Sequence, residues 1–138
     1  MAVNKPNGLI SPSQAKALNE QFIKTRSKEM NKIVKKLTGD KKEQDAYCTW
    51  FSIEELENYI AYTKEKATKN GKNLTGLNVY FGAYPTEDRH PKKSNMSTVF
   101  FAPTTETSKL DVTELSTESD TDLEGLNLGT IGFPPRAY

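Results

Sequence analysis

Ten residues in the middle of the chain, 76–85 (Gly-Leu-Asn-Val-Tyr-Phe-Gly-Ala-Tyr-Pro), constrain the fold more than any other stretch. Alternate residues would face opposite sides: Leu77, Val79, Phe81 and Ala83 on one side, and Asn78, Tyr80, Gly82 and Tyr84 on the other. Alternation with a period of two, bounded by glycine and proline, predicts a β-strand centred on 77–84. A run over 97–103 (Ser-Thr-Val-Phe-Phe-Ala-Pro) is the expected antiparallel partner, with its centre at 98–102.

A long helix is expected over 12–37, before this strand pair. Ser11 and Gln14 can form a capping box around Pro12, and apolar residues recur at helical spacing as far as Leu37. The stretch 25–28 contains no apolar residue, so a bend or break is expected there.

A second, amphipathic helix is expected over 53–69. Ser52 is its predicted N-cap, Glu55 completes a capping box, and Asn70 with Gly71 ends the helix. Together these elements predict an α+β fold, in which a small antiparallel sheet is packed by both helices and followed by an extended acidic C-terminal tail.

Three regions follow from composition: an N-terminal arm over 1–10, one α+β domain over 11–103, and a Ser/Thr-rich acidic tail over 104–138 that ends in an apolar docking segment. Ten Lys and Arg face three acidic residues over 5–42, whereas two face seven from residue 103 onwards. The chain therefore has a basic head and an acidic tail.

Several classes of protein are disfavoured. The single cysteine, Cys48, allows neither an intrachain disulfide nor a cysteine-based zinc cage. No signal peptide or membrane-spanning run is visible, so a cytoplasmic protein is expected. No cofactor is expected either, because the glycines do not have the spacing of a phosphate-binding or dinucleotide-binding loop.

The acidic turn over 120–125 (Asp-Thr-Asp-Leu-Glu-Gly) resembles the start of a calcium-binding loop, with glycine at its sixth place. Its twelfth place is Ile131, where such a loop needs a bidentate glutamate. No metal site is therefore expected.

Catalysis would depend on two residues. His90 follows Asp88 in a polar loop and could act as a general base, and Cys48 is the one thiol that could serve as a nucleophile. A hydrolase using His90 ranks only third among the interpretations, because no cluster of partner residues accompanies His90 or Cys48.

Nucleic-acid binding is the alternative interpretation. The helix over 12–37 is basic, the 89–93 loop adds Arg89, Lys92 and Lys93, and Tyr80 and Tyr84 offer rings on which bases could stack. The sequence has no RNA-recognition motif, and the acidic tail would compete for the same basic surface.

The leading interpretation is a non-enzymatic interaction or assembly protein that forms a homo-oligomer or binds another protein. Opposite charges at the two ends can attract each other, with basic residues contributed by Lys32, Lys35 and Lys36. The apolar part of the tail would provide affinity through Leu126, Leu128, Ile131, Phe133 and Tyr138. Head-to-tail contacts of this kind produce rings or filaments.

Three motifs resemble a pattern shared by a group of small bacterial proteins of unknown function. They are W-F-x-x-E-E-L-x-x-Y-I over 50–60, G-x-x-x-Y-F-G-x-Y-P over 76–85, and T-V-F-F-x-P-T over 98–104. The resemblance covers about residues 47–104. It implies no activity, cofactor or catalytic residue.

Overall fold

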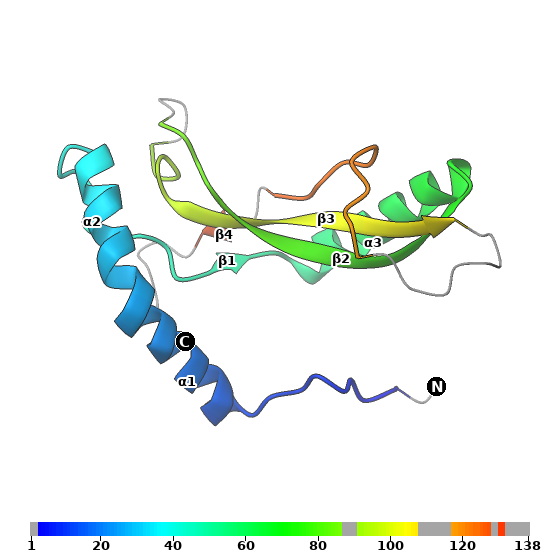
Figure 1. Ribbon diagram of the computed structural model, residues 1–138, viewed down its shortest axis with the longest axis horizontal. Helices are drawn as coiled ribbons and strands as arrows, with labels where there is room; N and C mark the ends of the chain where they lie inside the picture. Colours follow the sequence, from blue (N-terminus) through cyan, green and yellow to red (C-terminus); the bar gives the residue numbers. More distant parts are fainter. Residues whose placement is uncertain (1–2, 87–90, 108–116, 128–129, 132–138) are drawn as a thin grey trace.

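The computed structural model of the protein describes residues 3–86, 91–107, 117–127 and 130–131 (Figure 1). Its elements are helix α1 (Pro12–Phe22), the π-helical segment η1 (Ile23–Ser27), helix α2 (Lys28–Leu37), strand β1 (Thr49–Trp50), helix α3 (Ile53–Lys69), and strands β2 (Lys72–Ala83), β3 (Ser97–Thr107) and β4 (Thr130–Ile131). Helices combined with an antiparallel sheet confirm the predicted α+β class. Five of the predicted site residues lie outside the described residues: Arg89, His90, Leu128, Phe133 and Tyr138.

β2 and β3 form one long antiparallel pair, in which Tyr80 lies opposite Phe100. β3 runs through Pro103 to Thr107, beyond the predicted end of the domain at residue 103. Proline fits inside this strand because its nitrogen lies on the edge away from β2 and leaves no hydrogen bond of the pair unmade. The strand is therefore longer than predicted, because the Ser/Thr-rich composition after Pro103 hid its last residues.

The N-terminal helix has the predicted start and the predicted break. The Ser11 hydroxyl accepts a hydrogen bond from the Gln14 N–H at 3.1 Å, and the Gln14 side chain accepts one from the Ser11 N–H at 2.8 Å. The break at 25–28 takes the form of η1, where the helix widens for one turn. Helix α1 itself buries no residue, and Figure 1 shows it projecting away from the sheet.

Helix α2 reaches the rest of the molecule through a small core. Val34 packs with Ala46 and Met96, and Tyr84 packs against this cluster. Asp45 holds the same junction with polar contacts: its Oδ1 accepts a hydrogen bond from the Ser97 N–H at 2.6 Å, its Oδ2 accepts one from the Ser97 hydroxyl, and its own N–H donates to Asn31 Oδ1 at 2.8 Å. The helical segment is thus attached to the rest of the molecule through its C-terminal half.

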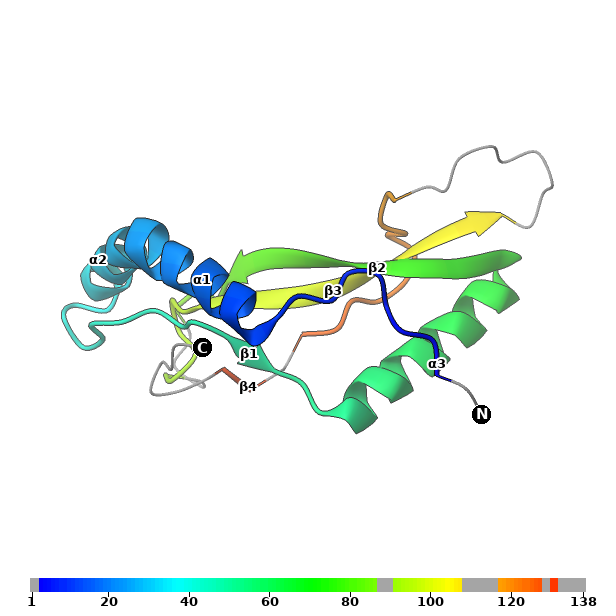
Figure 2. The same cartoon turned by 90° about the horizontal axis from the view of Figure 1, so that it is seen from below.

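Helix α3 lies beside β2 (Figure 2). The Ser52 hydroxyl accepts a hydrogen bond from the Glu55 N–H at 3.0 Å, as predicted for the N-cap. Tyr59, Thr63 and Ala67 are buried, which confirms the amphipathic pattern. None of the helices in the described part of the chain is long and apolar enough to cross a membrane.

The described part of the C-terminal tail docks on its own domain. Residues 117–127 follow the edge of β3 that faces away from β2, where Leu126 and Phe101 exchange two backbone hydrogen bonds of 2.8 and 2.9 Å (Figure 1). Farther along the chain, β4 pairs with β1, with Ile131 opposite Thr49. This second antiparallel pair was not predicted, because a strand of two residues carries no readable period.

Candidate functional site

An apolar groove lies between the helical segment and the sheet. It has a volume of about 600 Å³, and its apolar wall is formed by Phe22, Met30, Tyr47, Phe81 and Val99. These side chains come from α1, α2, the connection before β1, β2 and β3. The groove exists because α1 projects away from the sheet instead of closing onto it.

Phe81 is the most unusual side chain of this groove. It lies within β2 and 91% of it is exposed, while Val79 on the same face is 53% exposed. Burying a phenylalanine side chain fully contributes about 1.5–3 kcal/mol, which the isolated chain does not gain here. Clustered exposure of large apolar residues on a folded domain is typical of an interaction surface.

The backbone of β2 is also open on one side. Phe101 directs its N–H and C=O toward Leu126, away from β2, so its register partner Val79 directs its own groups away from β3. Because strand residues alternate, Leu77, Val79, Phe81 and Ala83 all present their N–H and C=O groups to this outer edge. No described residue forms a backbone hydrogen bond with these outward groups. We call this stretch, 77–83, the open edge.

The other edge of the sheet is covered by residues 117–127. The Asp120 N–H donates to the Pro103 carbonyl at 2.8 Å, and the Asn127 side chain donates to the Val99 carbonyl at 2.8 Å. Gly125 permits the close approach, since a Cβ at this position would lie 2.9 Å from the Phe101 carbonyl oxygen. Residues 117–127 therefore protect one edge of the sheet, and no described residue pairs with the β2 edge.

Asp120 is the electrostatic anchor of this tail segment. Its Oδ2 accepts a hydrogen bond from the Thr105 hydroxyl at 2.7 Å and lies 3.0 Å from Lys72 Nζ, and its side chain is only 5% exposed. The Thr105 hydrogen bond, supported by Lys72, lowers the pKa of Asp120 below its usual value against the opposing effect of burial. This ion pair links the tail to the first residue of β2.

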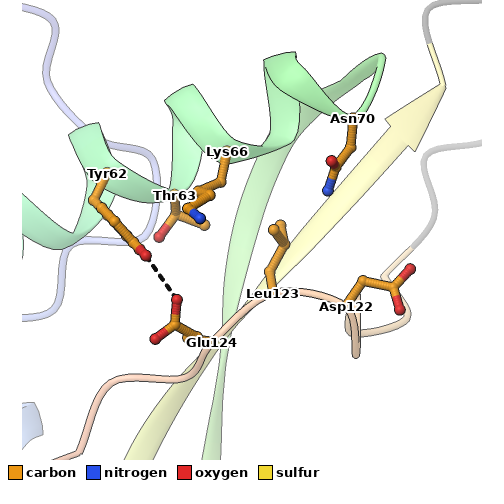
Figure 3. A pocket seen from close by; sticks show the side chains of 7 residues that line it. All are labelled: Tyr62, Thr63, Lys66, Asn70, Asp122, Leu123 and Glu124. Atoms are coloured by element: carbon orange, nitrogen blue, oxygen red, sulfur yellow. Dashed lines mark hydrogen bonds between the residues drawn. The ribbon is translucent and has the colours of Figure 1, made fainter.

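Helix α3 and the tail enclose a small polar pocket of about 240 Å³ (Figure 3). The Tyr62 hydroxyl donates to Glu124 Oε1 at 2.7 Å, and the Tyr59 hydroxyl donates to the Glu124 backbone carbonyl at 2.8 Å. The pKa of Tyr62 is raised by its hydrogen bond to the carboxylate, and the pKa of Tyr59 is raised mainly by burial. The hydrogen bonds from Tyr62 and Tyr59 to Glu124 therefore attach the tail to α3 beside this pocket.

The predicted stacking tyrosines are engaged with the tail. Tyr80 stacks on Phe100 with ring centroids 5.2 Å apart, and its hydroxyl lies 2.6 Å from the Ser119 hydroxyl. The Tyr84 hydroxyl donates to Asn127 at 2.7 Å. The structure brings one of the predicted basic residues to them, because Lys93 Nζ lies 5.8 Å from the centre of the Tyr84 ring; Lys92 is exposed.

The predicted attraction between basic head and acidic tail takes another form in this structure. Asp120 pairs with Lys72 and Glu124 bonds to Tyr62, whereas Lys32 pairs with Glu29 on its own helix at 3.2 Å. Lys35 and Lys36 are exposed in the last turn of α2. Of the predicted apolar tail residues, Leu126 is half-buried against β3 and Ile131 lies in β4.

Cys48 is exposed and lines the apolar groove, where its neighbours are Tyr47 and Thr49. Within the described residues, no three His, Cys, Asp or Glu side chains are placed to hold a metal ion. Sequence reasoning missed Asp45, Asp120 and the exposure of Phe81. No local signal identifies them, because each depends on contacts between segments far apart in the chain.

The chain has no significant match among protein-family models, curated proteins or solved structures. Its function is therefore argued from the geometry of the molecule.

Proposed function

We propose that this protein is a non-enzymatic assembly protein that self-associates through the apolar groove and the adjoining open edge of β2. The observation that carries this proposal is the 91% exposure of Phe81, which lies near the C-terminal end of β2. Val79 and the groove residues Phe22 and Met30 extend the apolar surface around it.

The contacts made by three acidic side chains support the proposal of an interaction protein. Asp45 joins α2 to β3, Asp120 joins the tail to β2, and Glu124 joins the tail to α3. These carboxylates are occupied by structural contacts within the chain.

Helix α1 supports a second copy as the partner. It buries no residue, and Leu18 on its surface is 65% exposed. Most of the stability of a helix in a protein comes from packing of its apolar face, so α1 would gain stability from packing against another surface. A second copy carries the same apolar groove and the same open edge, and it is present at the same concentration as the first.

The proposal is tested by size-exclusion chromatography with light scattering over a range of protein concentrations, recorded at protein and nucleic-acid wavelengths. We expect a nucleic-acid-free multimer for the wild type. Phe81→Ser removes the exposed ring from each copy and should raise the dissociation constant of a dimer by roughly 10²- to 10⁴-fold, because two rings are lost at about 1.5–3 kcal/mol each.

The matched control is Ile53→Ser, which removes another apolar side chain that is 70% exposed, at the start of α3. This variant should associate like the wild type. A wild type that stays monomeric at the highest concentration would contradict the proposal, and a monomer carrying nucleic acid would support the alternative instead.

A further inference from the structure

We propose that two copies of this chain pair through the open edges of their β2 strands. The strands run antiparallel about a two-fold axis at Tyr80, so that two two-stranded sheets join into one four-stranded sheet. This inference rests on the self-association proposed above and specifies the surface that forms it.

The unused backbone groups of β2 give the first argument. The N–H and C=O groups of Val79 and Phe81 point away from β3, and no described residue forms a backbone hydrogen bond with them. An exposed row of this kind is a template for another strand. The opposite edge of the sheet is covered by residues 117–127, so among the described residues the β2 edge is the one left for pairing.

The lack of protective features gives the second argument. Natural edge strands are commonly guarded by lysine, proline, a bulge or very short length. In β2 the bulge lies between Leu74 and Gly76, outside the open edge, and Lys72 stands at the far end of the strand. No residue from 73 to 84 is charged, so two identical copies meet without like-charge repulsion.

Side-chain complementarity selects both the partner and the register. An axis at Tyr80 places Val79 opposite Phe81 of the partner subunit, and Leu77 opposite Ala83 of the partner subunit. Each pair joins a larger and a smaller apolar side chain on one face, and pairs of aromatic and β-branched residues stabilise antiparallel strands. Residues 79 and 81 both direct their backbone groups outward, so each such pair exchanges two hydrogen bonds.

The sheet itself gains from this pairing. A two-stranded sheet is marginally stable by itself, and further strands add to the stability that packing against α3 already provides here. Joining the two β2 strands gives a sheet of four strands, in which a neighbouring strand covers Phe81.

Single cysteines test the register in the full-length chain, with Cys48→Ser as background. Tyr80→Cys places two thiols opposite each other with Cα atoms about 4.5 Å apart, within disulfide range. Tyr84→Cys is the matched control, because Tyr84 lies on the same face and, like Tyr80, forms a hydrogen bond to the tail. Its two copies would lie about 27 Å apart, eight residues along the strand.

We expect the disulfide-linked dimer to form about tenfold faster, or more, at position 80 than at position 84. Equal rates in a protein that is multimeric by light scattering would overturn the β2 pairing and leave self-association standing. A faster reaction at position 79 or 81 would also overturn the axis at Tyr80. A monomeric wild type would overturn both proposals.

A second pair of variants tests the backbone. Val79→Pro removes an N–H that points to the open edge and spares the hydrogen bonds to β3, whereas Val79→Ala trims the side chain and keeps the N–H. The proline variant should dimerise about tenfold more weakly than the alanine variant. Equal dimerisation of the two folded variants contradicts pairing through this edge, and the cysteine comparison decides the matter if the proline variant fails to fold.

Discussion

Individual carboxylates hold this molecule together where its apolar core is small. Within the part of the chain that the structure describes, the buried hydrophobic residues are Val34, Ala46, Tyr59, Ala67 and Met96. Asp45 and Asp120 each join segments distant in sequence, with short hydrogen bonds to Ser97 and Thr105. Hydrogen bonds to charged groups contribute more than neutral ones, so each carboxylate matters in a domain of modest core.

Replacing Asp120 should therefore weaken attachment of the tail. Asp120→Asn loses the ion pair with Lys72, and we expect a loss of about 1.5–3 kcal/mol in the free energy of unfolding, measured by urea denaturation. Asp122→Asn is the matched control, because Asp122 is 79% exposed and lies 4.0 Å from the same Lys72 nitrogen. An equal loss in the two variants would contradict the role of Asp120.

The pH dependence of this difference follows from the lowered pKa of Asp120. Its stabilising effect is present above its ordinary value of 3.8 and is lost as pH falls through the lower value of the folded state. The stabilities of the wild type and Asp120→Asn should thus differ at neutral pH and converge as the pH falls from 3.8 through the lower pKa of the folded state. If the stability difference between the two proteins persists at this low pH, it arises from packing and not from the charge of Asp120.

At the scale of elements, the two capped helices differ in what they contact. Ser11 and Ser52 both accept a hydrogen bond from the N–H three residues on, and Ser11 also has the return bond of a capping box, but α1 buries no residue, whereas α3 buries Tyr59, Thr63 and Ala67. Loss of a cap costs about 1 kcal/mol. That cost reaches global stability only where the helix is packed in the cooperative unit.

Ser52→Ala should therefore lower the melting temperature by about 3–6 °C, while Ser11→Ala should leave it nearly unchanged. Both are measured by circular dichroism in the Phe81→Ser background, which removes the effect of association. Equal shifts in melting temperature would show that α1 belongs to the same cooperative unit as α3.

At the scale of the whole molecule, the chain is divided into a joined body and a projecting segment. The body contains the β2–β3 pair, α3 and the docked residues 117–127, while α1 extends away from it (Figures 1 and 2). Association would give α1 and the open edge of β2 the contacts they lack in one copy.

Hydrogen exchange measured by mass spectrometry should display this division. In the Phe81→Ser monomer, the amides of α1 should exchange fast and those shared by β2 and β3 slowly, because few contacts protect α1. In the wild-type multimer, peptides covering 77–83 should gain protection. Exchange of α1 as slow as that of the sheet in the monomer would contradict the division.

The sequence by itself determined the long helices, their starts and the central part of the β2–β3 pair. Local rules suffice for the Ser11 and Ser52 caps, the break at 25–28, the turn at Asn70 and Gly71, and the pairing of 77–83 with 97–103. These features depend on residues close in sequence or on strand alternation, so they can be predicted from the amino-acid sequence.

Tertiary structure alone decided where the tail docks and which apolar residues stay exposed. The Asp120–Lys72 pair joins residues 48 positions apart, and the hydrogen bond of Tyr62 to Glu124 spans 62. Phe81 and Phe101 both belong to apolar strand patterns, yet one is 91% exposed and the other packs on Phe51 with ring centroids 5.0 Å apart. Periodicity defines a face of a strand, but only the packing of distant segments determines what covers that face.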